Sequence, residues 1–257
     1  MTHEVLLNEK GKELAKDLLA VAPSPVLLQG GTGMGKSVLA RHLASELGRV
    51  YSGVNAHPGM DIGLLVGIWR PSPTKAGVTI DWQDGVLTEE IQSGKVFLFE
   101  ELTRAPQEAV SRLFGLLDNG FRYWSLPEAG IPDVPVHEDF WLIATANPPR
   151  VGYQAARLDK ALESRFVFTY AMDEPIADEE AIVSQWVDAA TANRILTLTV
   201  DARRQPETYL STRDVVIMAQ LIARGFSLVK AVQYGVAPKY SADYSRGLMA
   251  LAEAHGA

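Results

Sequence analysis

The stretch Gly30–Ser37, which reads GGTGMGKS, decides the fold of this 257-residue chain. It fits the pattern G-x-x-x-x-G-K-[ST] without a gap, between the apolar run 26–29 and a helix predicted from Ser37 to about Leu47. Glycines let successive backbone N–H groups point toward a phosphate, Lys36 supplies a cation, and the Ser37 hydroxyl can bind Mg²⁺. A glycine-rich turn without function would have to coincide with both flanking elements, so we predict a phosphate-binding loop. The predicted nucleotide-binding residues are Gly30, Gly31, Thr32, Gly33, Met34, Gly35, Lys36, Ser37 and Val38.

A second apolar run, 96–99, ends in two carboxylates, Glu100 and Glu101. Successive strand residues point to opposite sides, so the two acids can do different jobs. In the usual pattern, an aspartate holds Mg²⁺ and the following glutamate polarises the attacking water. Glu100 is longer than aspartate by one bond of about 1.5 Å, which either adjusts the metal geometry or weakens Mg²⁺ binding. We predict that Ser37 and Glu100 bind Mg²⁺ and that Glu101 is catalytic; a solvated acidic strand end is the alternative.

Three further polar residues follow apolar elements in an order that suits an ATPase site. Asn147 ends a third apolar strand, where its amide could bind the γ-phosphate or orient the water, although Asn-Pro alone is a turn signal. Arg165 falls on a predicted helix-to-strand turn, and Arg213 falls near the start of a later helix. Ordinary solvation is the alternative for each arginine.

Strands alternate with helices as far as Met172, and only helices follow. This order predicts an α/β domain with a parallel sheet flanked by helices over 1–172, then a small all-α lid domain over 173–257. Two insertions are expected, a partly ordered one at about 57–84 and a hairpin at about 121–140. Strands are predicted over 26–29, 51–54, 96–99, 141–145 and 166–170, hairpin strands over 121–126 and 134–138, and helices over 8–20, 37–47, 85–93, 107–117, 158–163, 178–192, 212–223, 228–234 and 242–255.

The ordered set of motifs resembles the AAA+ superfamily. It consists of the phosphate loop, the acidic stretch 100–105 (EELTRA), the strand end 144–148 and the triplet Ser164-Arg165-Phe166. The resemblance covers about residues 10–225, and only the phosphate loop is highly specific by itself.

Within that superfamily the chain is most similar to the MoxR-type group, which includes CbbQ, NorQ and the gas-vesicle protein GvpN. Residues 61–67 and 82–87 resemble the insertion in the second helix of that group. The excursion at 121–140 lies where the group carries its pre-sensor hairpin.

This resemblance implies an ATPase that binds ATP and Mg²⁺ and forms a homo-oligomeric ring, with six subunits as the family expectation. Asn147 matches sensor 1, and Arg213 looks like sensor 2, acting on the nucleotide of its own subunit. Arg165 matches the arginine that reaches the γ-phosphate bound by the neighbouring subunit, which can contribute roughly 10³–10⁵ in rate. Arg104 could also act across the subunit interface.

By the same resemblance, the chain remodels or activates a partner protein. The partner would carry a von Willebrand A-type domain, and the client would be a metalloenzyme or carboxylase that needs activation or cofactor insertion. The two insertions would carry the motion to the client. Four aromatic side chains in them could grip a polypeptide or be buried: Trp69, Trp82, Phe121 and Trp124.

Composition limits the remaining classes of function. A net charge of −7 argues against a surface that mainly neutralises nucleic acid, and the pair Arg203–Arg204 is interpreted as a solvated loop. The apolar runs are too short to cross a bilayer and the chain has no cysteine, so a cytoplasmic location is expected. Two alternatives stay open: the motor subunit of a nucleic-acid-processing or restriction system, which DNA-stimulated hydrolysis would indicate, and a small-molecule P-loop kinase, which would leave Asn147, Arg165 and Arg213 unexplained.

Overall fold

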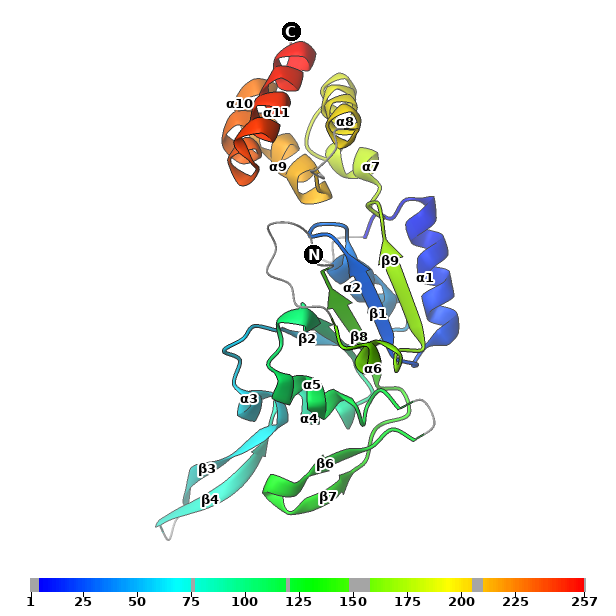
Figure 1. Cartoon of the computed structure of the whole chain (residues 1–257), viewed down its shortest axis with the longest axis vertical. Helices are drawn as coiled ribbons and strands as arrows, with labels where there is room; N and C mark the ends of the chain where they lie inside the picture. The colour runs from blue at the N-terminus through cyan, green and yellow to red at the C-terminus, as the bar shows by residue number, and fades with distance from the viewer. Residues whose placement is uncertain (1–4, 75–76, 119–120, 148–157, 205–209, 257) are drawn as a thin grey trace. The chain divides into compact units, whose positions relative to one another are not determined.

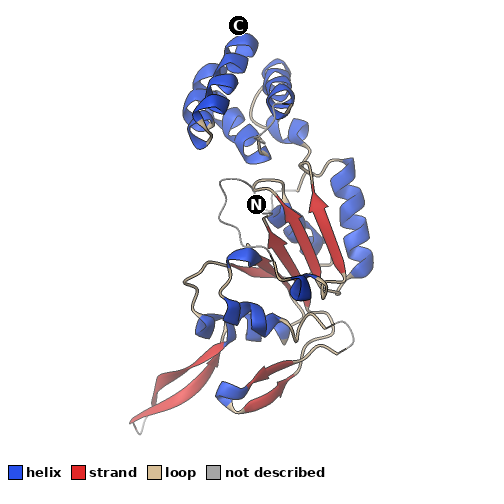
Figure 2. Cartoon of the chain, viewed as in Figure 1, coloured by secondary structure: helices blue, strands red, loops and turns tan. Residues whose placement is uncertain are grey.

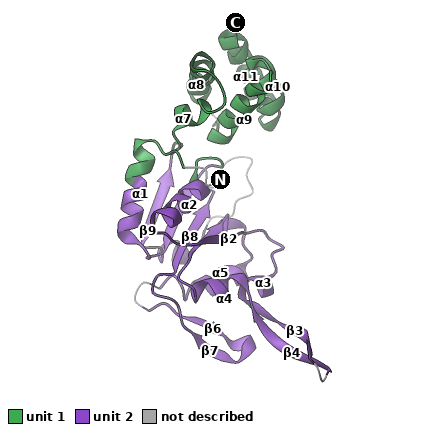
Figure 3. Ribbon diagram, turned by 180° about the vertical axis from the view of Figure 1, so that it is seen from behind, with its two compact units in different colours: residues 1–13, 32–35, 174–257 green, residues 14–31, 36–173 purple. Residues whose placement is uncertain are grey.

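A computed structural model describes most of the chain, in two compact units (Figure 3). The described residues are 5–74, 77–118, 121–147, 158–204 and 210–256. Unit 1 consists of residues 1–13, 32–35 and 174–257, and unit 2 of residues 14–31 and 36–173.

Unit 2 is built on a five-stranded parallel sheet with the strand order β2-β5-β8-β1-β9 (Figure 1). The strands are β1 Val26–Gly30, β2 Tyr51–Asn55, β5 Val96–Glu100, β8 Trp141–Ala146 and β9 Phe168–Met172. The inner strands β5, β8 and β1 are almost wholly buried, as expected where helices cover both faces of a parallel sheet. The predicted α/β fold class is therefore confirmed.

Short helices connect these strands and follow the predicted order. The helix α1 begins after Asn8, whose Oδ1 accepts a hydrogen bond from the Gly11 N–H at 2.9 Å and so caps it. The helical elements are α1 Glu9–Val21, α2 Lys36–Glu46, α3 Ile62–Val66, α4 Val86–Ile91, η1 Leu102–Arg104, α5 Gln107–Leu113 and α6 Lys160–Glu163. One apolar core packs the sheet against α3, α4, α5 and α6, and it includes Phe97, Phe99, Leu142 and Trp124.

Both insertions contain antiparallel hairpins (Figure 2). The first is more ordered than predicted: after α3 it forms β3 Gly67–Thr74 and β4 Gly77–Asp84 in unbroken register. The second pairs β6 Trp124–Leu126 with β7 Ile131–Val134, through the 3₁₀ turn η2 Pro127–Ala129. Its second strand begins earlier than the predicted 134–138, because Gly130 turns the chain at φ 73° directly after η2.

From residue 179 onward, the described part of unit 1 is helical and has its own apolar core. The prediction of one helix over 178–192 is wrong. Asp178 caps a short helix, and Asp188 starts another by accepting a hydrogen bond from the Thr191 N–H at 2.9 Å. The elements are α7 Glu179–Val183, α8 Ala189–Arg203, α9 Thr212–Ala223, α10 Leu228–Gly235, η3 Ala237–Lys239 and α11 Ala242–Gly256.

The interpretation of Arg203 as part of a solvated loop is also wrong. Arg203 ends α8, and its guanidinium donates to both carboxylate oxygens of Glu179, at 2.7 and 2.8 Å. A bidentate pair of this kind holds two helices together. Arg204 does remain exposed, beside Asp201. None of the described helices combines the length and the apolar character that a membrane crossing requires.

Candidate functional site

The phosphate loop connects the end of β1 to the start of α2, as the sequence predicts. Gly33 and Gly35 have φ values of 79° and 100°, a region that other residues rarely adopt. Within unit 1, a Cβ added at Gly33 would lie 2.7 Å from the Cβ of Ser211. Glycine is therefore required at this position for both conformation and space.

The ammonium of Lys36 is buried where β1 and β8 end. Its Nζ donates to the carbonyl oxygens of Gly30 at 2.7 Å and Gly31 at 2.8 Å, and to Oδ1 of Asn147 at 3.1 Å. All three acceptors are neutral oxygen atoms. The structure thus brings two of the predicted site residues, Lys36 and Asn147, into contact. The ammonium of Lys36 is a cation that an anionic ligand could bind.

Ser37 and Glu100 also meet at this end of the sheet. Ser37 lies in the first turn of α2, and its hydroxyl donates to the carboxylate of Glu100, the last residue of β5. A hydroxyl beside a carboxylate is the oxygen donor set that Mg²⁺ prefers, so the predicted metal ligands fit that ion. The side chain of Glu100 reaches the Ser37 hydroxyl directly.

Glu101 has an unusual backbone, with φ 55° and ψ 43°. A positive φ outside glycine is uncommon and concentrates at functional sites. The Glu101 N–H donates to Thr145 Oγ1 at 3.1 Å, and Arg104 Nη1 donates to the Glu101 carboxylate at 2.6 Å. Sequence reasoning missed Thr145, although a lone hydroxyl in an otherwise apolar strand was the available signal.

Arg165 lies at the opposite end of the sheet. The register pairs Val26, the first residue of β1, with Phe168, the first residue of β9, and Arg165 precedes that pair. The guanidinium carbon of Arg165 is 5.0 Å from the ring centroid of Phe114, and Nη1 is 4.0 Å from Oδ2 of Asp118. The structure therefore does not bring Arg165 together with Lys36 or Glu101.

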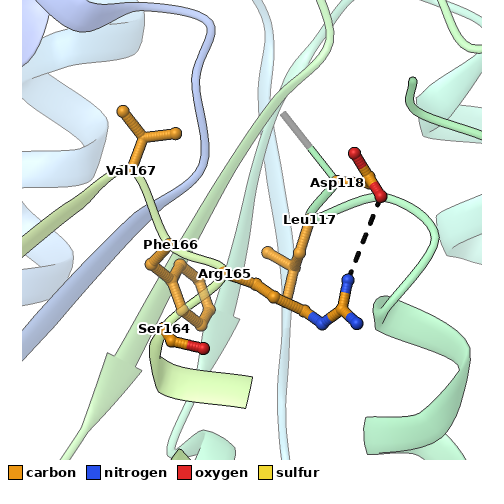
Figure 4. Close-up of a pocket in the computed structure, with 6 residues that line it drawn as sticks. All are labelled: Leu117, Asp118, Ser164, Arg165, Phe166 and Val167. Atoms are coloured by element: carbon orange, nitrogen blue, oxygen red, sulfur yellow. Dashed lines mark ion pairs between the residues drawn. The ribbon is translucent and has the colours of Figure 1, made fainter. Parts of the chain in front are cut away.

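A hollow of about 360 Å³ surrounds this arginine (Figure 4). The Arg165 side chain extends toward Asp118, while Val167 points the other way (Figure 4). The lining residues are Leu117, Asp118, Ser164, Arg165, Phe166 and Val167. The side chain of Arg165 remains partly exposed, so its cationic tip is accessible from solvent.

In unit 1, Arg213 is exposed in the first turn of α9, and a buried polar network fixes that turn. Ser211 caps the helix in a reciprocal capping box with Asp214. The Asp214 carboxylate also accepts hydrogen bonds from Lys239 Nζ at 2.7 Å and from the Tyr240 hydroxyl at 2.8 Å. Sequence reasoning did not identify this network, because Lys239 and Tyr240 come from a different element than Asp214.

The environment of Asp214 shifts two pKa values in opposite directions. Desolvation alone would raise the pKa of Asp214, but hydrogen bonds from Lys239, Ser211 and Tyr240 outweigh it and hold that pKa below its ordinary value. Burial, together with the charge of Asp214, raises the pKa of Tyr240 far above its ordinary value. Asp214 is therefore ionised, and Tyr240 is a neutral donor, at any ordinary pH.

Comparisons with known proteins agree with this architecture. Residues 25–166 match the family model of the AAA domain (dynein-related subfamily), and residues 179–255 match the CbbQ/NirQ/NorQ C-terminal model. The chain is 30% identical to protein NorQ of Paracoccus denitrificans over 256 residues, covering 95% of this chain and 92% of that protein. It is 31% identical to protein CbbQ of Hydrogenophilus thermoluteolus, covering 79% of this chain and 76% of that protein.

A solved structure shares the fold at low sequence identity. NtrX from Brucella abortus, crystallised in complex with ADP, superposes with a TM-score of 0.55 at 15% identity, covering 84% of this chain and 50% of that chain. At this identity the similarity concerns the fold alone.

Proposed function

Since the chain belongs to the MoxR-type group of AAA+ ATPases, we propose that it assembles into a ring and uses ATP hydrolysis to activate a partner protein. One observation carries the proposal: at the carboxyl ends of β1, β5 and β8, Lys36 donates a hydrogen bond to Asn147, and the neighbouring Ser37 donates one to Glu100. Ligands of open parallel sheets bind at such ends. The matching C-terminal model extends the similarity to NorQ and CbbQ beyond the ATPase domain.

In this proposal the phosphate loop binds ATP and Mg²⁺. The backbone N–H groups of residues 30–38 surround the phosphates, and Lys36 exchanges its neutral acceptors for phosphate oxygens. Ser37 and Glu100 would hold Mg²⁺, which supplies charge neutralisation on the phosphates when it is bound.

Glu101 and Asn147 act on the water that attacks the terminal phosphate. Glu101 accepts a proton from that water, and Asn147 orients it or binds the phosphate. For this role the Glu101 carboxylate has to leave the guanidinium of Arg104. Arg213 contacts the nucleotide of its own subunit, next to Gly33 of the phosphate loop.

Arg165 completes the site of a neighbouring subunit in this mechanism. Its position at the far end of the sheet supports action between chains, because the same end cannot serve the site of its own chain. Hydrolysis then depends on assembly, by roughly 10³–10⁵ in rate. Six subunits are proposed by resemblance, and so are a partner with a von Willebrand A-type domain, a metalloenzyme or carboxylase as client, and the cytoplasm as location.

The test combines nucleotide binding with the state of assembly. The purified chain is titrated with ATP in the presence and absence of Mg²⁺ by calorimetry, and its mass is measured by light scattering under the same conditions. We expect Mg²⁺-dependent ATP binding, steady release of phosphate and a ring-sized mass with ATP. A chain that does not respond to adenine nucleotides, or that hydrolyses ATP at full rate as a monomer, would contradict the proposal.

A further inference from the structure

The β3–β4 hairpin carries one apolar face, because apolar and polar pairs alternate along its register. Residues directly opposite each other in a register point to the same face. The pairs Trp69↔Trp82, Pro71↔Ile80 and Pro73↔Val78 share one face, here called the apolar face. The alternating pairs, such as Arg70↔Asp81 and Ser72↔Thr79, put polar groups on the other face.

The outer part of this apolar face is exposed. Val78 is 72% and Ile80 is 67% accessible, and Pro71 and Pro73 are exposed beside them. At the base, Trp69 packs edge-on against Trp82 and donates from Nε1 to the carbonyl oxygen of Glu128 at 2.9 Å. The base is thus anchored in unit 2, and four apolar side chains beyond it are available for contact.

The two edges of the hairpin differ in their free backbone groups. In an antiparallel pair, opposite residues alternate between pairs that exchange two backbone hydrogen bonds and pairs that exchange none. Proline suits only the pairs without hydrogen bonds, because it has no backbone N–H to donate. Pro71, Pro73 and their partners therefore direct their backbone groups outward. The edge of β3 lacks N–H donors at 71 and 73, whereas β4 offers outward N–H and C=O groups at Val78, Ile80 and Trp82.

No third strand pairs with this hairpin among the described residues. The prolines protect the β3 edge against strand addition, and β4 has no such protection. An extended segment added along β4 would satisfy the free backbone groups and lay alternate side chains on the apolar face.

Extending the function proposed above, we infer that the β4 edge and the apolar face bind an extended segment of the client polypeptide, with uncharged apolar residues at alternate positions. A second copy fits less well. The face offers on the order of a few hundred Å², short of the ~800 Å² per partner in a stable interface. Pairing of β4 with β4 from another copy would also be two-fold symmetric, whereas a ring requires head-to-tail contacts.

The experiment measures binding of a defined peptide to the full chain without nucleotide. The probe is a fluorescein-labelled peptide of alternating valine and serine with a lysine at each end. Its binding is measured by fluorescence anisotropy. Ile80→Lys charges the apolar face, and Thr79→Lys is the matched control on the polar face of the same strand. Val78→Pro removes one outward N–H and keeps the pairing within the hairpin, as Pro73 does opposite it.

We expect Ile80→Lys and Val78→Pro each to weaken peptide binding about tenfold, and Thr79→Lys to change it less than twofold. A peptide methylated on alternate backbone nitrogens should bind the parent chain about tenfold more weakly. Absence of peptide binding, or equal effects of Ile80→Lys and Thr79→Lys, would overturn the inference. The inference would also be overturned if sedimentation showed that Ile80→Lys alone changes the oligomeric state, because a second copy would then cover the face.

The inference and the proposed function can fail separately. A parent chain that hydrolyses ATP but does not bind the peptide refutes this inference alone. One that binds the peptide but never hydrolyses ATP refutes only the proposed function.

Discussion

The two ends of the five-stranded sheet are built differently. At the carboxyl end, Lys36 donates a hydrogen bond to Asn147, and Ser37 donates one to Glu100. At the amino end, Arg165 lies over Phe114 with its guanidinium partly exposed. In the proposed mechanism, the carboxyl end binds an anionic nucleotide and the amino end offers a cation to another chain. The two halves of the proposed ATPase site therefore lie on one chain at places where they cannot meet.

The largest expected effect concerns the amino end. Arg165→Ala should lower the rate of ATP hydrolysis about 10³-fold, because the transition state loses a guanidinium. ATP affinity, measured by calorimetry, should change little. Lys160→Ala is the control, since it removes an exposed cation from α6, the short helix that precedes Arg165. Equal rates of hydrolysis for Arg165→Ala and Lys160→Ala would show that Arg165 does not contribute to hydrolysis.

The next effect concerns the carboxyl end. Glu101→Gln should lower hydrolysis about 10²-fold or more, because the attacking water loses its proton acceptor. ATP binding should remain, since Lys36 and the loop are intact. Phosphate release is measured alongside Glu108→Gln, an exposed carboxylate on α5. Turnover of Glu101→Gln at the parental rate would assign the catalytic role to another residue.

The helical unit offers a contrast to both ends, because its buried charge supports the fold. Asp214→Asn should lower the free energy of unfolding by about 2 kcal/mol, since Lys239 loses its carboxylate partner. The pKa of Asp214 lies below its ordinary value, so its stabilisation is complete above about pH 4 and is lost as the pH falls through the folded-state pKa.

Denaturant unfolding of Asp214→Asn should therefore approach the parental stability on acidification below about pH 4. Asp243→Asn, which affects only a surface pair, should change stability by less than about 0.5 kcal/mol. A pH-independent difference for Asp214→Asn would show that the ion pair does not contribute.

The smallest effect should come from Asp118. Its carboxylate is 4.0 Å from Arg165 in a partly exposed pair, which is worth less than about 1 kcal/mol. Asp118→Asn should change hydrolysis less than about fivefold, measured against Asp133→Asn on β7. A loss as large as that of Arg165→Ala would mean that Asp118 itself takes part in the site.

The sequence predicted the central sheet and the order of the motifs, because apolar runs ending in polar residues leave a strong local signal. The predicted placements of Lys36, Ser37, Glu100 and Asn147 follow from that signal. The β3–β4 hairpin was not recognised, since Gly and Pro mask its alternation. The split near residue 188 was missed because apolar spacing continued through it. The Asp214 network depends on contacts between helices, which no local pattern contains. The last residue of the predicted strand end 144–148, Pro148, lies outside the described residues.

The central claim is that each hydrolytic site combines residues of two chains, and mixing two inactive variants tests it most directly. Glu101→Gln retains its arginine, and Arg165→Ala retains its glutamate. Co-assembled in equal amounts, they should form intact sites at about a quarter of the interfaces of a ring. We therefore predict that the mixture hydrolyses ATP far faster than either variant alone. A mixture that stays as inactive as its components, although light scattering shows mixed rings, would contradict the account.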